Sequence, residues 1–371
     1  MRVGINLLYL LPKIVGGTET YASGLLRGLA KEGAAHEYVV FVNKESAEWP
    51  MPEEKNITRV ICPVSASNRA RRYFYEQINL PRLLKKHRID MIHSLGYVGP
   101  LRPPCPAIVT VPDLNYLVIG HTMPVFKRSI LKFFSTRAAK RADAVITISN
   151  FSKNAICESG QISLDKVFVT LLGPRFDPDD RTDYAEEDIR RNYGIAAPYL
   201  AAFGGRALHK NISRLLRVFK ELKKNFSCKL IIIGHLSANV DVVNLLDGVI
   251  MTGYVPAEHI LPLLKGAEVF ILPSLYEGFG LPVLEAQQAG VPVVCSNAGS
   301  LPEVAGEGAL FFDPYSIEDM EEKLTRVLGD KDLKETLRQK GLSNLKRFSW
   351  EKTALDTLAV YNWVYGKWRD A

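Results

Sequence analysis

The stretch PSLYEGFGLPVLEAQQAG, at positions 273–290, combines two carboxylates with a glycine-rich turn. An apolar, strand-like run precedes it, and the helical pattern that follows has a proline in its first turn, where proline is tolerated. Gly278 and Gly280 let the backbone approach a ligand closely, and the unpaired N–H groups of a helix N-terminus suit a phosphate. Glu277 and Glu285 flank that N-terminus. The spacing therefore predicts an anion site bordered by two hydrogen-bond acceptors.

The segment E-G-F-G-L-P-x-x-E-A resembles the E-x7-E motif of the retaining family-4 glycosyltransferases, which are two-domain enzymes of the GT-B fold. The resemblance implies that Glu277 faces hydroxyl groups of a donor sugar. It implies that Glu285 holds the ribose hydroxyls, for which a carboxylate has two acceptor oxygens. It also implies that backbone N–H groups of Phe279 to Leu281 meet the diphosphate and the sugar. The alternative is two surface glutamates near a structural glycine turn.

A second turn, GGRALHKN at positions 204–211, follows a strand-like run and opens a helix. It resembles the family's G-R-x(n)-K-N segment, whose arginine and lysine neutralise the donor diphosphate; these are Arg206 and Lys210 here. The leaving diphosphate gains negative charge as the glycosidic C–O bond breaks, and fixed cations stabilise that charge. The gap between the two cations is one residue shorter than in many family members.

Two segments of the second half resemble the part of the family's site that surrounds the nucleobase. LIIIG at 230–234 resembles the strand and turn near the base, and it ends at Gly234. TGYV at 252–255 resembles the segment whose backbone reads the base, here with Tyr254 and Val255. The resemblance thus adds these three residues to the expected donor site.

The resemblance extends over nearly the whole chain, with its segments in the same order. The stretch 14–29 resembles the glycine-rich loop and helix that contact the donor phosphates, here through Gly16 and Gly17. The stretch 145–156 resembles the end of the family's first domain, and 297–314 resembles the stretch that closes the second. Both halves are therefore expected to contribute to donor binding.

One position departs from the family pattern. Members commonly carry a histidine after the strand matched by IVTV at 108–111, and it is thought to touch the sugar and help the transition state. Pro112 stands there and Asp113 follows. His93 and His121 are other histidines of this half, of which a structural role is favoured for His93 and a loop position for His121. The candidate catalytic residues are Glu277, Asp113, Arg206 and Lys210.

Short apolar strands alternate with helical patterns in both halves, which is typical of parallel sheets covered on both faces. In the first half the expected strands lie near residues 2–8, 37–42, 57–62, 89–94, 106–111, 143–148 and 166–172, with helices near 18–32, 70–88, 123–141 and 151–158. In the second half the expected strands are 199–205, 228–234, 249–253, 267–273, 291–296 and 309–313. The fold class is therefore α/β, with two doubly wound, Rossmann-like domains whose ligands lie beyond the carboxyl ends of the strands.

A stretch rich in Gly, Pro and charge at 173–197 predicts a linker and a short helix between the two domains. We place an N-terminal, acceptor-binding domain at 1–175 and a C-terminal, donor-binding domain at 190–354. The two domains are expected to face a cleft. A long aromatic helix is expected from Ser349 to about Trp368. The GT-B resemblance implies that this helix crosses back to pack on the first domain, to which we assign residues 355–371.

The net charge of +7 is unevenly spread. Residues 1–175 hold 24 Lys and Arg against 13 Asp and Glu, whereas residues 176–371 hold 23 against 27. Much of the basic excess lies at 69–72, 82–88 and 127–141. Such a surface suits an anionic membrane or a phosphate-rich acceptor, and the alternative is an ordinary solvated surface. The chain has no recognised nucleic-acid motif, so no nucleic-acid partner is expected.

Several other classes are excluded by the sequence. Five widely spaced cysteines predict neither a disulfide framework nor a zinc site, and no P-loop motif occurs. The acidic run DPDD at 177–180 lies in the linker, where solvated turn residues are expected rather than a metal site. Asn6 interrupts the first apolar run, so this run is expected to be a buried strand rather than a signal peptide. No stretch approaches the ~20 apolar residues of a membrane span. We therefore expect a cytoplasmic protein, at the inner face of the cytoplasmic membrane, with no metal or cofactor.

The sequence as a whole predicts a hexosyltransferase. The expected reaction moves a hexose, with mannose favoured, from a nucleoside diphosphate sugar to a glycan or lipid-linked acceptor in cell-surface polysaccharide synthesis. The resemblance implies retention of the anomeric configuration by a front-face displacement. The alternative is a catalytically silent GT-B protein that binds a nucleotide sugar, as the departure at Pro112 would allow.

Overall fold

The computed structural model describes residues 1–370 except 13, 15, 119–124, 161, 177–185, 197, 206 and 237–246. The chain divides into two compact units. The first unit comprises Met1–Gly173 and Phe348–Ala371, and the second comprises Pro174–Arg347. The sequence placed the corresponding boundaries at 175 and 355, and the start of the second domain at 190.

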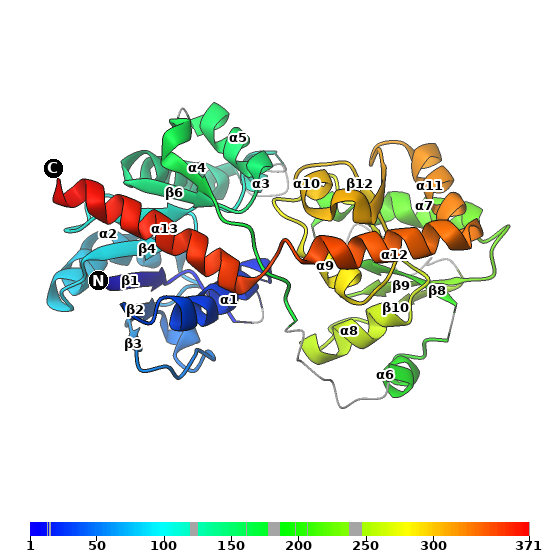
Figure 1. Ribbon diagram of the computed structural model, residues 1–371, viewed down its shortest axis with the longest axis horizontal. Coiled ribbons are helices and arrows are strands. Elements are labelled where there is room, and N and C mark those ends of the chain that lie inside the picture. The colour runs from blue at the N-terminus through cyan, green and yellow to red at the C-terminus, as the bar shows by residue number, and fades with distance from the viewer. Residues whose placement is uncertain are drawn as a thin grey trace. The chain divides into compact units, whose positions relative to one another are not determined.

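The first unit is built on a seven-stranded parallel sheet of order β3-β2-β1-β4-β5-β6-β7 (Figure 1). Its strands are β1 Arg2–Leu7, β2 Glu37–Val42, β3 Ile57–Ile61, β4 Met91–Ser94, β5 Ala107–Thr110, β6 Ala144–Thr147 and β7 Val167–Val169. Its helices are α1 Gly17–Glu32, α2 Arg69–Lys86, α3 Asn115–Val118, α4 Val125–Arg141, α5 Asn150–Gly160 and α13 Trp350–Arg369. Short 3-10 turns lie at η1 Lys44–Ser46 and η3 Leu164–Lys166. The strand expected at 166–172 is shorter than predicted, because only its first residues pair with β6.

The second unit repeats this plan with a six-stranded sheet of order β10-β9-β8-β11-β12-β13, parallel throughout. Its strands are β8 Tyr199–Phe203, β9 Lys229–Ile233, β10 Val249–Met251, β11 Val269–Leu272, β12 Val293–Ser296 and β13 Ala309–Phe312. Its helices are α6 Glu186–Asn192, α7 Ile212–Leu222, α8 Ala257–Lys265, α9 Leu281–Gln288, α10 Leu301–Ala305, α11 Ile317–Gly329 and α12 Lys331–Leu345, with 3-10 turns η4 Leu208–Lys210 and η5 Gly306–Gly308. The strand order reverses between β8 and β11, and open α/β sheets bind ligands beyond the carboxyl ends of strands at such a point.

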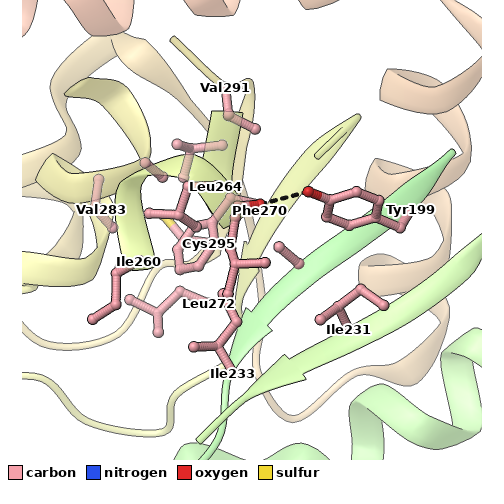
Figure 2. Packing of buried hydrophobic residues seen from close by; sticks show 14 of the residues in the cluster. Tyr199, Ile231, Ile233, Ile260, Leu264, Phe270, Leu272, Val283, Val291 and Cys295 are labelled. Carbon is pink, nitrogen blue, oxygen red and sulfur yellow. Dashed lines mark hydrogen bonds between the residues drawn. The ribbon is translucent and has the colours of Figure 1, made fainter. Parts of the chain in front are cut away.

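The second sheet is buried on both faces, as its apolar runs predicted. On β8, Tyr199 and Ala201 belong to one core cluster and Leu200 and Ala202 to the other, so successive residues serve opposite layers. Figure 2 shows the first of these layers, in which the Tyr199 hydroxyl donates to the Leu263 carbonyl at 2.7 Å. Each fully buried large side chain contributes roughly 1.5–3 kcal/mol, so these two layers hold the loops at the sheet edge in place.

The long helix α13 packs along α1 in the first unit (Figure 1). Gly24 permits the approach, because a Cβ at that position would lie 2.1 Å from the Trp350 ring. Thr353 extends the attachment by donating to the Leu171 carbonyl at 2.6 Å. This packing explains why the return to the first unit begins at Phe348, ahead of the predicted 355. The return of the helix to the first unit agrees with the sequence-based expectation.

Candidate active site

The turn between β11 and α9 carries the motif that the sequence singled out. Gly280 caps α9 with a φ of 113°, and a Cβ there would lie 2.7 Å from the Leu301 side chain, so this position requires glycine. Pro282 stands in the first turn of the helix, as expected. The Ser300 hydroxyl lies 3.0 Å from the Glu277 carbonyl and 2.7 Å from the Phe279 carbonyl. The turn that holds Gly278 and leads to Leu281 is thereby fixed at the N-terminus of α9.

Lys210 and Glu277 meet at this turn. The Lys210 ammonium donates to Glu277 Oε1 at 2.8 Å, and the Ser274 hydroxyl donates to the same oxygen at 2.7 Å. Burial tends to raise the pKa of Glu277, but Lys210, Ser274 and then His209 outweigh it and hold this pKa below its usual value. Glu277 is therefore a carboxylate at neutral pH, and the two sequence-predicted residues form one charged pair.

The loop after β8 is tied to the loop after β11 by Asn211. This residue adopts a left-handed conformation, with a φ of 59°, between η4 and α7. Its amide group donates to the Pro273 carbonyl at 3.0 Å and to the Pro314 carbonyl at 2.9 Å. The Leu275 N–H donates to the His209 carbonyl at 2.7 Å. We call the segments 204–211 and 273–280 together the paired turns; Arg206 lies outside the described residues.

A second group of predicted residues lines a pocket of about 210 Å³ in the second unit. Gly234 and Val255 lie in its wall with Tyr254, whose side chain is exposed. Glu285, from α9, also lines the pocket and is almost fully buried. We call this cavity the Glu285 pocket, and its complete lining is Arg175, Phe203, Ile233, Gly234, His235, Tyr254, Val255, Ile260, Pro282 and Glu285. The sequence-predicted base and ribose contacts thus lie around one cavity.

Arg175 is a residue of this pocket that sequence reasoning missed. Its Nε lies 2.9 Å from Glu285 Oε1. Burial raises the pKa of Glu285, while Arg175 and then Lys210 oppose the rise. In the sequence Arg175 falls in the linker, where a charged residue is unremarkable, and no local pattern distinguishes it. Only folding brings Arg175 into contact with Glu285.

The remaining predicted residues lie in the first unit. Gly16 precedes α1 and Gly17 begins it, so both follow β1 at the carboxyl edge of the sheet. Asp113 follows β5 at the same edge, where its Oδ1 accepts from the Tyr97 hydroxyl at 2.8 Å and from the Asn115 N–H at 3.0 Å. Asp113 is thus a held carboxylate rather than a freely rotating one.

His93 is a structural residue, the interpretation that the sequence favoured. It is fully buried on β4, with Nδ1 2.8 Å from the Tyr361 hydroxyl and Nε2 2.8 Å from the Thr110 hydroxyl. Burial lowers the pKa of His93 to about 3, so the ring is neutral. The neutral, enclosed ring does not supply the function of the family histidine. His121 lies outside the described residues, as does the DPDD run at 177–180.

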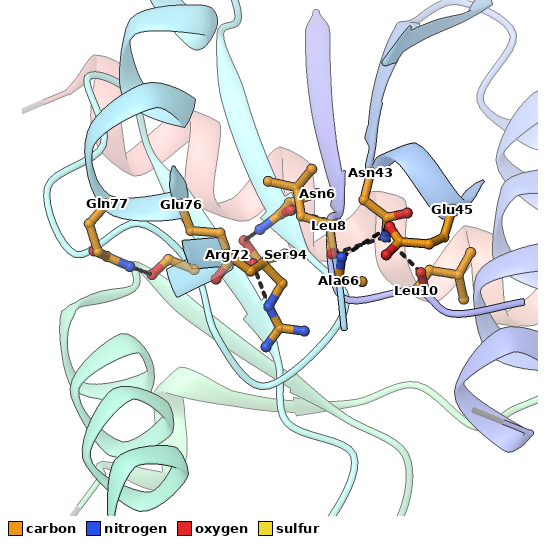
Figure 3. A network of polar contacts seen from close by, with 11 residues as sticks. Asn6, Leu8, Leu10, Asn43, Glu45, Ala66, Arg72, Glu76, Gln77 and Ser94 are labelled. Atoms are coloured by element: carbon orange, nitrogen blue, oxygen red, sulfur yellow. Dashed lines mark hydrogen bonds and ion pairs between the residues drawn. The ribbon is translucent and has the colours of Figure 1, made fainter. Parts of the chain in front are cut away.

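A buried polar network at the carboxyl ends of β1 and β4 was also missed (Figure 3). The Asn6 amide donates to the Ser94 hydroxyl at 3.2 Å, and Arg72 lies 4.0 Å from Glu76 on α2. Burial raises the pKa of Glu76 to about 7, against the effects of Arg72 and Asn6. In the same region Asn43 donates to the carbonyls of residues 8 and 10, which fixes the loop after β1.

No group of three or more His, Cys, Asp or Glu is placed to hold a metal ion among the residues that the structure describes. None of the described helices is both long enough and apolar enough to cross a bilayer. The five cysteines are free thiols.

The two doubly wound units define an α/β protein of the GT-B fold. A family model for "Glycosyl transferases group 1" matches residues 185–343, and one for "Glycosyltransferase Family 4" matches residues 15–173. The O-antigen chain mannosyltransferase B of Escherichia coli is 31% identical over 265 residues, which span 69% of this chain and 70% of that protein. The chain belongs to the family-4, group 1 glycosyltransferases.

Solved structures agree on the fold. Sucrose-phosphate synthase from Thermosynechococcus elongatus superposes with a TM-score of 0.77 at 18% identity, covering 99% of this chain and 100% of that one. Anabaena HepE, in a complex with UDP and glucose, superposes with a TM-score of 0.72 at 15% identity, covering 98% and 99%. At these identities the likeness establishes the architecture of both units.

Proposed function

We propose that this protein transfers a hexose, with mannose favoured, from a nucleoside diphosphate sugar to a glycan or lipid-linked acceptor in cell-surface polysaccharide synthesis. The observation that carries the proposal is the contact of Lys210 with Glu277 at the N-terminus of α9. A cation, a carboxylate and helix N–H groups converge there, which suits a diphosphate beside sugar hydroxyls. The mannosyltransferase name of the Escherichia coli relative supports the choice of sugar.

We propose a separate role for each charged or polar group of the paired turns. Glu277, held in its charged form, accepts hydrogen bonds from hydroxyls of the donor hexose. Lys210 shares its charge between Glu277 and the diphosphate, and Arg206 is proposed to assist it. The N–H groups of Gly278, Phe279, Gly280 and Leu281 and the dipole of α9 face the same anion.

The proposed chemistry is a front-face displacement with retained configuration. The acceptor hydroxyl oxygen bonds to the anomeric carbon on the face from which the diphosphate departs. The bond from that carbon to the diphosphate oxygen breaks, its electron pair stays on the diphosphate, and the acceptor proton passes to a phosphate oxygen. Stabilisation of the diphosphate by Lys210 is then the main catalytic effect. No metal ion is required, because Lys210 and the α9 dipole supply the positive charge.

The test begins with calorimetric titration of GDP, UDP, dTDP and ADP in EDTA. Micromolar binding of one nucleotide is expected and would name the base. Transfer from the matching labelled nucleotide sugar to membrane lipid and glycan extracts follows, and NMR of the product reports its anomeric configuration. A folded protein that binds none of the four nucleotides would refute the proposal, and an inverted product would refute the retaining step.

The replacement of the family histidine by Pro112 favours one second candidate, a protein that binds the nucleotide sugar without transferring it. The two candidates share the donor site and differ in turnover. Slow hydrolysis or transfer of the bound sugar, lost in Lys210→Ala, would exclude the silent protein. Stoichiometric donor binding with an intact sugar after prolonged incubation would favour it.

We further propose that the first unit meets an acceptor at an anionic membrane surface, at the cytoplasmic face. Helix α2 supports this with an exposed stripe that joins cations to apolar side chains: Arg71, Phe74, Ile78, Arg82 and Lys85. A groove of about 670 Å³ lies beside it, and its lining includes Lys44 and Tyr75. Basic residues near an anionic surface contribute about 1 kcal/mol each, and apolar side chains add to this.

Vesicle sedimentation tests the membrane proposal. The protein should bind vesicles of one-third phosphatidylglycerol in phosphatidylcholine and should leave pure phosphatidylcholine in solution. Arg71→Glu with Arg82→Glu should abolish the binding, whereas Arg191→Glu, on an exposed helix of the second unit, should not. Equal binding to both kinds of vesicle would remove the electrostatic part of the proposal.

A further inference from the structure

Arg175 approaches the Glu285 pocket from the segment that opens the second unit. About 30% of its side chain is exposed, whereas Glu285 is exposed by 1%. The guanidinium Nε lies 2.9 Å from Glu285 Oε1, and within the described part of the chain this buried oxygen has no hydrogen-bond partner besides that ion pair. The pair therefore joins a buried carboxylate to a cation that reaches it from the pocket.

An unpaired carboxylate in this position would be costly. Burying a charge without a partner is strongly unfavourable, and the group then tends to take up a proton. Two cations act on Glu285, first Arg175 and then Lys210, which is itself engaged by Glu277. The other titratable side chains around the pocket are His235 and Tyr254. Arg175 is therefore the principal charge available to balance Glu285.

The charge of Glu285 matters for what the carboxyl can bind. A carboxylate only accepts hydrogen bonds, whereas a protonated carboxyl group also carries a donor. The diol of a ribose offers two hydroxyl donors to one carboxylate. A neutral carboxyl would lose part of that complementarity. Glu285 therefore needs to be both charged and fixed in direction.

We propose that Arg175 is a positioning residue of the donor site, which holds the Glu285 carboxylate in its charged form and orientation so that it accepts both hydroxyls of the donor ribose. This inference rests on the proposed function, because it requires a nucleotide in the Glu285 pocket. It extends the donor site beyond the family motifs to the segment that opens the second unit. Arg175 acts through Glu285, and no direct contact with the nucleotide is assigned to it.

The test compares two ligands that differ only at the group Glu285 would hold. The preferred nucleoside diphosphate and its 2′,3′-dideoxy analogue are titrated by calorimetry into wild type, Arg175→Ala, Arg175→Lys and Arg191→Ala. Arg175→Ala should weaken the ribonucleotide about tenfold or more and leave the dideoxy analogue within about twofold. Arg175→Lys should recover part of the loss. Arg191→Ala removes an exposed arginine that pairs with Asp188 and should match wild type.

A change of pH supplies a second readout that a merely structural role would not move. Burial already raises the pKa of Glu285, and removal of Arg175 raises it further. The ribonucleotide affinity of Arg175→Ala should therefore fall at a higher pH than that of wild type. The dideoxy analogue should show no such displacement. Equal pH profiles in both proteins would contradict the proposal.

A double variant keeps the proposal testable if Arg175→Ala alone is poorly folded. Glu285→Gln has no charge to balance, so adding Arg175→Ala to it should change ribonucleotide affinity by less than about twofold. An equal loss of both ligands in Arg175→Ala would instead mean direct contact with the base or diphosphate and would overturn the inference. A wild-type protein that binds no nucleotide would refute the proposed function itself.

Discussion

Glu277 and Glu285 belong to one motif and lie on either side of the N-terminus of α9, yet their surroundings differ. Glu277, in the paired turns, receives a lysine and a serine, and its pKa falls below the usual value. Glu285, in the pocket, has one arginine at Oε1, and burial raises its pKa. Two carboxyl groups whose surroundings shift their pKa values in opposite directions are expected to have different tasks. The first is organised to remain charged, and the second relies mainly on Arg175 to balance its charge.

The largest expected effect on the transfer rate comes from removing Lys210, the cation of the paired turns. Lys210→Ala removes the proposed charge beside the diphosphate and leaves Glu277 without its cation. Loss of one such electrostatic contact should lower the transfer rate roughly 10²–10³-fold. Steady-state transfer assays with Lys220→Ala, an exposed lysine of α7, serve as the control. A decrease smaller than about tenfold would remove Lys210 from the proposed mechanism.

A stability effect should follow from loosening the same region while Lys210 and Glu277 stay in place. Asn211→Ala removes three side-chain hydrogen bonds, two donated to the Pro273 and Pro314 carbonyls and one accepted from Arg214. This should cost about 2–3 kcal/mol in the free energy of unfolding. Urea denaturation measures it, with the exposed Asn225→Ala as the control. If the comparison holds, transfer should suffer more than nucleotide binding in the Glu285 pocket. A larger loss of nucleotide affinity would show that the two regions are not separable.

The two carboxyl groups should respond oppositely when their charges are removed. The folded-state pKa of Glu277 is lowered, so its stabilising contribution is present above its ordinary value of 4.5 and is lost as pH falls through the folded pKa. The folded-state pKa of Glu285 is raised, so its charge opposes folding at neutral pH and this cost disappears as pH falls towards 4.5.

Thermal unfolding at pH 7 distinguishes these cases. Glu277→Gln should lose about 1–2 kcal/mol, because Lys210 is left without a carboxylate. Glu285→Gln should change stability by less than about 1 kcal/mol or increase it. The difference between the two variants should shrink below pH 4.5. A Glu285→Gln protein that is the less stable of the two at pH 7 would reverse the comparison.

The smallest expected effect is that of a chelator. If Lys210 and the α9 dipole supply the positive charge, EDTA at millimolar concentration should leave the transfer rate unchanged within about twofold. The same assay with added Mg²⁺ is the matched condition. Abolished activity that Mg²⁺ restores would show that the paired turns bind a metal–diphosphate complex.

Much of the fold could be predicted from the sequence because the local patterns of apolar residues and glycines agree with the elements of the folded structure. The apolar runs became strands buried on both faces, and both glycine-rich turns follow strands that are neighbours in the sheet, β8 and β11. Their shared carboxyl edge explains how Lys210 and Glu277, far apart in sequence, come within 2.8 Å. The family resemblance supplied the roles, which composition and periodicity alone would not have given.

The features that sequence reasoning missed are those that depend on distant partners. Arg175 looks like a linker residue until the pocket places Glu285 beside it. Glu76 looks like a solvated helix charge, and only the packing of α2 shows that it is buried. The same holds for Trp350, whose ring fills the space left by Gly24 and so begins the return to the first unit before the predicted position.

The attachment of α13 to α1 has a consequence for biosynthesis. When the ribosome has released residues 1–173, α1 still lacks its covering helix, and the His93 ring lacks the Tyr361 hydroxyl with which it pairs. The residues of the second unit emerge next and are contiguous, so this unit has all of its chain available first. Domains tend to fold as units during synthesis. The first unit is therefore expected to complete its folding last. Until α13 has been synthesised, after the whole of the second unit, the apolar face of α1 stays uncovered.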